Sequence, residues 1–583
     1  MPTLEWIGKD KVINHHLDVP YRVLERQYSF DENGKHDADN GSENMIIHGD
    51  NLEALKSLLP QYEGRVKCIY IDPPYNTGNE GWVYNDNVND PRIKKWLGEV
   101  VGKEGEDLSR HDKWLCMMYP RLKLLQKLLA EDGVIFISID DTEYANLKLI
   151  CDEIFGSNCF VSNISWQRTY STRNDSKGIV NEVEHLLVYS KQSYWNPNKL
   201  PRTEEMNSKY KNPDNDRTLW RTDNAFAPGA ATHQGMVYAI QHPFTGQMLY
   251  PSNGACWRYQ QDQMLEIMRG WCDYELRDLN DAHERAVVCG VADENVRQGV
   301  QAIVLSEPLD VSAKKAQAVY DRGQWPRFFF TKGGYGGIAR KTYLENVGGK
   351  LPTNFWPFSE TGHTDEAKKE MLAIFDGKAT FDTPKPRRLL EFVLKVAGTE
   401  DALVLDSFAG SGTTAHAVLN MNKADGGNRK FILVEMGDYA DSITAERVKR
   451  VINGYGEGKN AAAGTGGSFS YYELGEPLMH GDVLNENVGV EKIREYVYFT
   501  DTKSRLPEPH PDEPYFMGVH VNSAYYFYYE RQAVTTLNRE FLHTVKTKAD
   551  AYVIYADLCT LSEAELEKYH ITFKKIPRDI TRL

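Results

Sequence analysis

The chain lacks the features that hold small extracellular domains together or anchor proteins in membranes. Its eight cysteines are scattered and form no C-x-x-C pair, so neither a zinc site nor a disulfide framework is predicted. No apolar run is long enough to span a bilayer, and the first residues lack the basic and apolar stretches of a signal peptide. These absences favour a protein of the reducing cytoplasm with no membrane partner.

The sequence also lacks an excess of basic residues. It carries 68 Lys and Arg against 83 Asp and Glu, which gives a formal net charge of −15. Such a chain is not held to nucleic acid by bulk charge. The negative net charge does not exclude a local basic face that contacts nucleic acid, because salt screens electric fields beyond about 10 Å. The stretch 322–350 has this character, with basic residues interleaved with aromatic ones and only one acid, Glu345.

What the chain does contain is an alternation of strands and helices. A length of 583 residues predicts two to four domains, and a hydrophobic content of 41% is ordinary for a globular protein. Apolar strands and amphipathic helices alternate in two separate stretches, which favours an α/β fold with a parallel sheet. The expected strands are 45–50, 66–71, 134–139, 402–405 and 431–434, and the expected helices are 51–59, 113–130 and 387–397.

Between these two stretches the periodic pattern is weak. Gly, Pro, Asn and Trp are frequent from about 190 to 360, which predicts an inserted, irregular module. Near the end of the chain, strands at 551–556 and 571–576 flank a helix opened by the capping box Ser562-x-x-Glu565. Loops are expected at 31–44 and 455–468, and the expected domains are 1–44, 45–190, 191–360, 361–475 and 476–583.

The first chemical motif is Asp72-Pro73-Pro74-Tyr75, directly after a buried strand. An amine on an aromatic ring is a poor nucleophile, because its lone pair is delocalised into the ring. Two acceptors aimed at its hydrogens pull the nitrogen toward sp³ geometry, and the Asp72 carboxylate and the Pro73 carbonyl can supply them. The prolines stiffen the loop, and Tyr75 offers a flat face to an extruded base. A turn in which Asp72 only caps the next element is the alternative, which the continuation Asn-Thr-Gly at 76–78 weakens.

The second motif is a glycine-rich stretch, Asp406-Ser-Phe-Ala-Gly-Ser-Gly-Thr-Thr414, between an expected strand and an expected helix. Glycines let the backbone approach a ligand closely, and a helix N-terminus presents unpaired amides. Glu435 ends the next strand, where an acid can accept from both ribose hydroxyls of a nucleoside. A nicotinamide enzyme is the usual rival, but the three-glycine G-x-G-x-x-G is missing. A tight strand–helix turn without a ligand is the structural alternative.

Two smaller motifs could assist the same site. Gly49-Asp50 ends the strand at 45–50 and could cradle an adenosyl ring, although Asp50 could equally cap the helix at 51–59. Thr-Pro-Lys-Pro at 383–386 precedes the helix 387–397 and could place Lys385 near a ligand carboxylate, although a solvated Lys385 at a helix start is as compatible.

Together these motifs resemble the DNA amino-methyltransferases, whose catalytic signature is D/N/S-P-P-Y/F and whose cofactor signature is F-x-G-x-G. Here the motif at 72–75 comes first and Phe408-Ala-Gly-Ser-Gly412 more than 300 residues later. That order resembles the beta group, in which a target recognition domain separates the two motifs. The stretches at 6–10 and 471–475, and the length, resemble the modification (Mod) subunit of Type III restriction–modification systems.

The resemblance implies a doubly wound, mostly parallel seven-stranded sheet, an inserted target recognition domain and a small α+β C-terminal region. Both motifs would then lie at the carboxyl ends of neighbouring strands. The expected catalytic residues are Asp72, Pro73, Pro74 and Tyr75. The expected contacts of the cofactor S-adenosylmethionine are Asp50, Lys385, Asp406, Phe408, Ala409, Gly410, Gly412, Thr413 and Glu435.

The implied substrate is an adenine amino group in double-stranded DNA, read by the module at 191–360. The expected DNA contacts in that module are Arg327, Lys332, Arg340 and Lys341. Because the chain is acidic, we expect a homodimer or a restriction subunit with nuclease and helicase functions as a partner at the DNA groove. No metal is expected to take part.

Three other functions are compatible with parts of the pattern. Methylation of the cytosine amino group uses the same chemistry, although that group more often has Ser in place of Asp72. A non-catalytic DNA-recognition or assembly subunit could retain the fold, and a nicotinamide oxidoreductase would leave 72–75 unexplained. The chain has no Pro-Cys motif, which argues against methylation at carbon 5 of cytosine.

Overall fold

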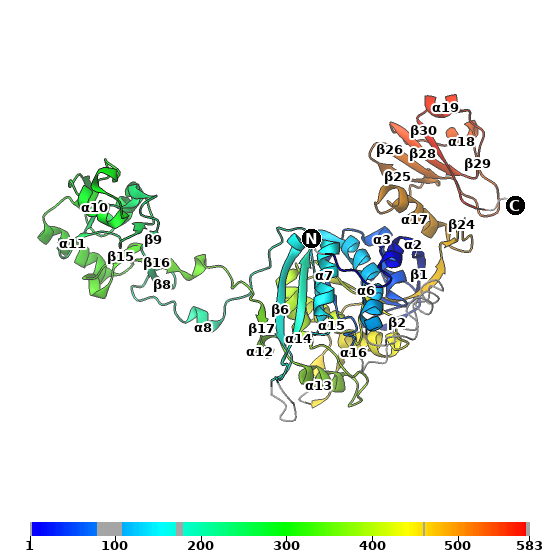
Figure 1. Cartoon of the computed structure of the whole chain (residues 1–583), viewed down its shortest axis with the longest axis horizontal. Coiled ribbons are helices and arrows are strands. Elements are labelled where there is room, and N and C mark those ends of the chain that lie inside the picture. Colours follow the sequence, from blue (N-terminus) through cyan, green and yellow to red (C-terminus); the bar gives the residue numbers. More distant parts are fainter. Residues whose placement is uncertain (1–2, 78–107, 171–178, 459–460, 579–583) are drawn as a thin grey trace. The chain divides into compact units, whose positions relative to one another are not determined.

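A computed structural model of the chain describes residues 3–77, 108–170, 179–458 and 461–578. Gly78 of the expected continuation after Tyr75 lies outside these ranges. The chain divides into two compact units (Figure 1), Met1–Asn198 with Pro352–Leu583 and, between them in sequence, Lys199–Leu351.

The described part of the first unit contains an eleven-stranded sheet (Figure 1). In spatial order its strands are β17 (Phe355–Trp356), β6 (Phe160–Gln167), β7 (Val183–Ser190), β5 (Leu129–Ile139), β4 (Val66–Ile71), β18 (Leu403–Asp406), β19 (Lys430–Glu435), β3 (Met45–His48), β22 (Phe469–Pro477), β1 (Arg22–Asp31) and β2 (Gly34–His36). The six neighbours from β5 to β22 are parallel, and β7, β1 and β2 pair antiparallel at the flanks. The predicted α/β class is confirmed, whereas the sheet has more strands than the seven expected.

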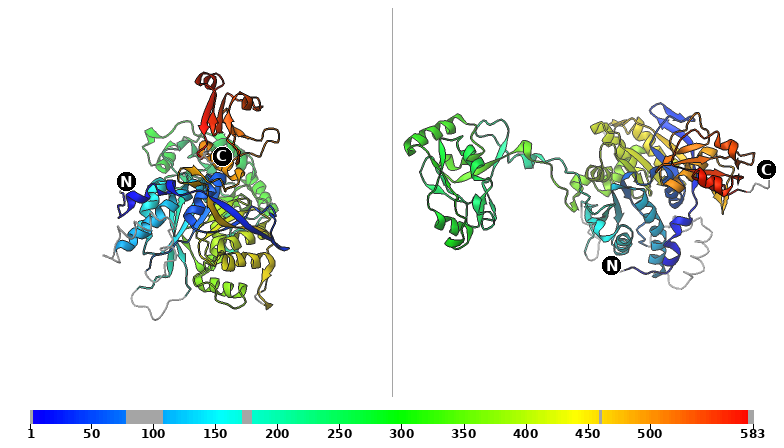
Figure 2. Two further views of the ribbon diagram at one scale, coloured as in Figure 1. Left: turned by 90° about the vertical axis from the view of Figure 1, so that its right-hand side faces the viewer. Right: turned by 90° about the horizontal axis from the view of Figure 1, so that it is seen from above.

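Helices cover both faces of this sheet, as Figure 2 shows in its left view. One group consists of α3 (Asn51–Tyr62), α6 (Leu108–Leu128) and α7 (Tyr144–Phe155), and the other of α14 (Arg387–Ala397), α15 (Thr413–Asp425) and α16 (Glu446–Asn453). Strand β4 and the part of β5 from Gly133 to Ile139 are almost wholly buried and mostly apolar, as strands covered on both faces must be. The side chain of Asp50 caps α3 by accepting from the amides of Leu52 and Glu53.

Two expected loops contain regular structure. The polar stretch 31–44 includes β2, which pairs with β1 through a turn where Gly34 has φ +109°, so a glycine suits that position. The stretch 455–468 includes β21 (Ala462–Ala463), paired with β20 (Gly454–Tyr455). Both elements are short and polar or small-residue-rich, so neither has the apolar alternation that predicts a strand.

The second unit, Lys199–Leu351, contains short elements around its own core. A three-stranded sheet consists of β15 (Phe328–Phe330), β16 (Ile338–Tyr343) and β8 (Trp220–Asn224), and a four-stranded sheet of β11 (Met248–Leu249), β10 (Ile240–Gln241), β14 (Ala302–Leu305) and β13 (Tyr274–Arg277). Its buried core is rich in aromatic side chains, among them Trp257 and Trp271. The strands are too short to give a periodic signal, which explains the irregular sequence pattern.

The end of the chain forms a four-stranded sheet, β25 (Phe516–His520), β26 (Ser523–Phe527), β28 (Ala551–Ala556) and β30 (Ile571–Lys575). The capping box of Ser562 and Glu565 is present at the start of α19 (Glu563–Lys568). Among the described residues, no helix is both long and apolar enough to cross a membrane.

Candidate active site

The two motif loops begin at adjacent points of the sheet. Strands β4 and β18 are parallel neighbours, with Cys68 opposite Val404 and Ile69 opposite Leu405. Each loop follows the carboxyl end of its strand, Asp72 directly after β4 and Ser407 directly after β18. Stretches separated by more than 300 residues in the sequence therefore meet at the edge of a parallel sheet where ligands commonly bind.

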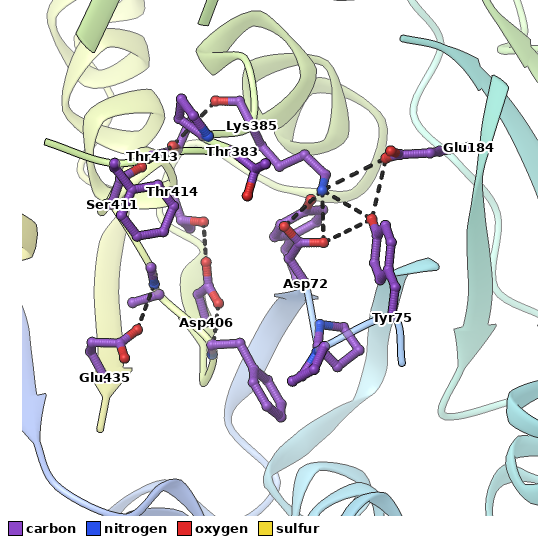
Figure 3. A pocket seen from close by; sticks show the side chains of 18 of the residues that line it. Asp72, Tyr75, Glu184, Thr383, Lys385, Asp406, Ser411, Thr413, Thr414 and Glu435 are labelled. Carbon is purple, nitrogen blue, oxygen red and sulfur yellow. Dashed lines mark hydrogen bonds and ion pairs between the residues drawn. The ribbon is translucent and has the colours of Figure 1, made fainter. Parts of the chain in front are cut away.

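A cavity of about 570 Å³ lies between these loops (Figure 3). Its volume is in the range of small-molecule sites, about 300–1,000 Å³. The lining includes both motifs, the Lys385 segment, Asp140 directly after β5, and residues of β7 and β19. The lining residues include Asp72, Pro73, Pro74, Tyr75, Arg168, Glu184, Phe381, Lys385, Asp406, Phe408, Ala409, Gly410, Ser411, Thr413, Thr414, Glu435 and Tyr439.

Asp72 lies at the centre of a charged cluster. The Lys385 ammonium donates to both of its carboxylate oxygens, at 2.8 and 2.7 Å, and the Tyr75 hydroxyl donates to Oδ1 at 2.9 Å. Burial raises the pKa of Asp72 above its ordinary value, and the neighbouring lysine opposes that rise. Lys385 therefore contacts the Asp72 carboxylate, whereas the sequence suggested a ligand carboxylate.

Two buried side chains, Trp114 and Glu143, fix the loop of 72–76 by hydrogen bonds. The fully buried indole of Trp114 on α6 donates to the Pro74 carbonyl at 2.7 Å. Asn76, which follows Tyr75, has φ +63°, and its side-chain amide donates to the buried carboxylate of Glu143. These contacts and the two proline rings restrict the loop, so its acceptors are preorganised.

The glycine-rich loop is held by hydrogen bonds within its own segment, by residues that follow it, and by Asn51, which donates to the Ser407 carbonyl at 3.1 Å. Asp406 accepts from the Phe408 amide at 3.1 Å and from the Thr414 hydroxyl at 2.5 Å. Burial raises the pKa of Asp406 to about 7. Gly410 and Gly412 have φ +50° and +78°, a region that favours glycine. A Cβ at Gly412 would lie 3.0 Å from the Thr444 carbonyl oxygen.

Glu435 ends β19 beside this loop. Its carboxylate accepts from the amides of Gly410 at 2.7 Å and Gly437 at 2.9 Å. Burial raises its pKa, and these backbone hydrogen bonds oppose the rise. Helix α15 starts at Thr413, which lines the cavity, so the positive end of a 13-residue helix faces the same space.

Several cavity residues carried no signal in the sequence. Glu184 on β7 comes within reach of Tyr75 and Lys385, and Arg168 pairs with it at 2.8 Å. Phe381 and Tyr439 add aromatic walls, with their ring centroids 5.8 Å apart. An acid and an arginine in polar strand ends are common on protein surfaces, so only the pairing of the strands reveals their position.

Asp50 and Gly412 are not among the residues that line the cavity. Besides capping α3, the Asp50 carboxylate accepts from Arg121 at 3.3 Å. The helix-capping alternative for Asp50 is therefore present in the structure. Gly412 is the residue before α15 and shapes the loop from outside the cavity.

The four basic residues expected to contact DNA differ in exposure. Arg327 and Lys332 are exposed, whereas Arg340 is half-buried and donates to Asp223 at 2.8 Å. Lys341 is fully buried, and its ammonium pairs with Asp214 and Asp216. The expectation for Lys341 is therefore wrong, because strand β16 turns this side chain into the core, where the two carboxylates neutralise it.

Comparison with known proteins identifies relatives across most of the chain. The Type III restriction-modification enzyme StyLTI Mod subunit of Salmonella typhimurium is 33% identical over 470 residues, 75% of this chain and 61% of that protein. The EcoPI Mod subunit of Escherichia phage P1 is 28% identical, over 74% of this chain and 63% of its own length. This chain thus spans about three fifths of these relatives.

A relative of more similar length is the Type II methyltransferase M.KpnI of Klebsiella pneumoniae. It is 30% identical over 395 residues, 67% of this chain and 80% of that protein. The family model described as DNA methylase matches residues 66–446, a range that begins at β4 and ends at the start of α16. It includes both motif loops, Lys385 and Glu435. The chain therefore belongs to the N6/N4 DNA methylase family.

Proposed function

We propose that this chain transfers a methyl group from S-adenosylmethionine to the exocyclic amino group of adenine in double-stranded DNA. The observation that carries the proposal is that the Asp72 carboxylate, on a stiff Pro-Pro loop, faces the same cavity as the glycine-rich loop. The names of the relatives, Type III Mod subunits and a Type II methyltransferase, support a role as the modification component of a restriction–modification system.

The residues of the cavity fit a nucleoside with a charged tail. Phe408, Ala409 and Gly410 give a close backbone approach, since a Cβ at Gly410 would lie 3.1 Å from the Phe381 ring. The Glu435 carboxylate has acceptor capacity beyond its two backbone bonds and suits ribose hydroxyls. The first turn of α15, at Thr413, suits a carboxylate. The cofactor, when bound, supplies an electrophilic methyl group on a positively charged sulfur.

The chain's own groups would activate the amine. The Asp72 carboxylate and the Pro73 carbonyl would accept its two hydrogens, which localises the lone pair on nitrogen. Tyr75 would stack on the extruded base and return part of the unstacking free energy, about 1–3 kcal/mol. The target nitrogen would bond to the methyl carbon as the carbon–sulfur bond breaks, and the amine would release one proton to water during or after transfer. Because the positively charged sulfur already activates the methyl group, positioning and electrostatics would carry most of the rate.

The unit Lys199–Leu351 is proposed as the target recognition domain. Its exposed Arg327 and Lys332 are suited to phosphate contacts, and Arg340 is available only if it leaves Asp223. We propose a homodimer and a restriction subunit as partners, because an acidic chain gains from additional basic surface at the DNA.

The test is methylation of DNA purified from a host without DNA methyltransferases, followed by mass spectrometry of its nucleosides. We expect N6-methyladenine with the wild type and no methylated nucleoside with Asp72→Ala. Detection of N4-methylcytosine instead would show that the substrate is the amino group of cytosine. Transfer by Asp72→Ala near the wild-type rate would refute the mechanism, and cofactor binding without transfer to any DNA would indicate a non-catalytic subunit.

A further inference from the structure

Lys385 engages the atoms of Asp72 that the proposed reaction requires. Its ammonium lies 2.8 and 2.7 Å from the two carboxylate oxygens and 2.9 Å from the Tyr75 hydroxyl (Figure 3). An ammonium and the amino group of a base are both compact N–H donors. The ammonium therefore competes with a target amine for the same carboxylate, so binding of the amine favours its displacement from at least one oxygen of Asp72.

A second carboxylate lies on the opposite side of the lysine. Glu184 on β7 has a side chain that is 8% exposed, with Oε2 at 3.7 Å from the Lys385 ammonium. The same oxygen is 3.2 Å from the Tyr75 hydroxyl. Its other oxygen, Oε1, accepts from Arg168 at 2.8 Å. Glu184 is thus anchored by an arginine while one oxygen faces the lysine.

The charges of this cluster balance. Asp72 and Glu184 are two carboxylates, and Lys385 and Arg168 are two cations. A buried ammonium without a partner is costly, so Lys385 can leave Asp72 only if another carboxylate receives it. Glu184 is the acid in position to do this, since both carboxylates raise the pKa of Lys385 despite its burial.

We infer that Glu184 is a positioning residue of this site, which receives the Lys385 ammonium when the target amine takes its place on Asp72. The inference rests on the proposed function. Glu184 also remains a partner for the Tyr75 hydroxyl when the amine engages Asp72, which keeps the ring oriented toward the base.

The decisive variants are Glu184→Gln alone and together with Lys385→Met. The glutamine leaves the cluster one negative charge short, so the lysine stays on Asp72. We expect kcat for methyl transfer at saturating cofactor to fall about tenfold or more, while the Kd of the cofactor changes less than about twofold. Removing the lysine as well frees Asp72, so the double variant should be several-fold faster than Glu184→Gln.

Two further variants separate this role from a structural one. Glu184→Asp keeps the charge, and its kcat should lie closer to the wild type than that of Glu184→Gln. Asp141→Asn removes a carboxylate that contacts His185, the neighbour of Glu184 on β7, and is the matched control. We expect it to leave kcat unchanged. Thermal unfolding of each variant reports whether it folds.

The outcomes are distinct for the inference and for the proposed function. A wild type that methylates no DNA overturns both. If the wild type is active, the inference alone fails when the double variant is as slow as Glu184→Gln, or when Glu184→Gln keeps kcat within about twofold of the wild type. A fast double variant with a slow single variant supports it, because a purely structural loss would not be relieved by a second substitution.

Discussion

The two loops that meet at the cavity are held in different ways. The glycine-rich loop has hydrogen bonds within its own segment, such as those of Asp406 with the Phe408 amide and the Thr414 hydroxyl, in addition to contacts from Asn51, Glu435 and Thr444. The loop of 72–75 is fixed by groups from remote parts of the chain, with Trp114 on the Pro74 carbonyl and Lys385 on the Asp72 carboxylate. The first loop is therefore supported partly by its own hydrogen bonds, whereas the second is held mostly by groups that other elements bring to it.

This difference predicts that substitutions in the two loops affect different properties of the protein. A loop that is held partly by its own hydrogen bonds can keep its shape when one contact from another element is lost. A loop held by remote side chains reaches its catalytic geometry only when the whole sheet is formed. Substitutions in the first loop should therefore affect cofactor binding and stability, and substitutions around the second should affect transfer.

The largest effect is expected from Asp72→Asn. It removes the carboxylate that is proposed to accept from the amine, and also the partner of Lys385. Methyl transfer, measured with a radiolabelled methyl donor, should fall on the order of 1,000-fold, as for other preorganised electrostatic groups. Calorimetric titration should find the cofactor Kd nearly unchanged. A large loss of cofactor affinity would mean that the two loops do not act separately.

Asp406→Asn makes the same change in the other loop and should alter stability instead. Burial raises the pKa of Asp406 to about 7, so the folded protein holds a proton that the unfolded chain, with an ordinary pKa near 4, releases. Stability from this group is therefore present below about pH 4 and lost as the pH rises to 7. The other carboxylates of the cavity, Asp72 and Glu435, are present in both proteins, so the comparison isolates the effect of Asp406 on the pH dependence of stability.

The measurement is urea unfolding of ligand-free protein at pH 5 and pH 8. The wild type should lose roughly 3 kcal/mol more than Asp406→Asn between these values, about 1.4 kcal/mol for each pH unit below the folded pKa. Equal losses in the two proteins would show that Asp406 titrates normally in the fold.

Gly412→Ala tests the backbone of the cofactor loop more locally. Its φ of +78° strains an alanine, and the added Cβ would lie 3.0 Å from the Thr444 carbonyl oxygen. Gly426 at the end of α15 has φ +74° and no neighbour within 4 Å of its Cβ position. Gly426→Ala is therefore the control for backbone strain alone, about 1 kcal/mol, and Gly412→Ala should lose about 2 kcal/mol. Only Gly412→Ala should weaken cofactor binding.

The sequence was sufficient for the parts of the fold that depend on local patterns. The buried strands β4, β18 and β19 and the loops after them were predictable, because continuous apolar runs and turn residues are contiguous in the sequence. The outer strands β1, β2, β6, β7 and β17 were not, because they mix polar and apolar residues or are very short. The sheet therefore has more strands than predicted.

The failures to predict the positions of Glu184 and Lys341 have the same physical cause. Glu184 joins the site only because β7 pairs antiparallel with β5, so that His185 lies opposite Ile139. Lys341 belongs to a basic stretch of sequence, but β16 pairs with β8 and brings it against Asp214. Long-range strand pairing determines both positions, and a linear pattern of charges contains no information on it.

The smallest effect is expected from Trp114→Phe, which removes one remote support of the catalytic loop. The indole N–H donates to the Pro74 carbonyl at 2.7 Å, and phenylalanine keeps an aromatic ring in the buried site. A single hydrogen bond of this kind contributes about 1 kcal/mol. If that bond positions the loop, kcat should fall about fivefold while the cofactor Kd stays constant.

The control for Trp114→Phe is Trp271→Phe in the second unit. Its buried indole likewise donates to a backbone carbonyl, that of Phe328, at 2.9 Å. Both variants should lose similar free energy of unfolding, but only Trp114→Phe should lose kcat at saturating DNA. An unchanged kcat in Trp114→Phe would mean that the loop of 72–75 keeps its geometry without the indole. A slowed kcat in Trp271→Phe would mean that a lost buried hydrogen bond lowers kcat wherever it lies, and the loss in Trp114→Phe would then not report on this loop.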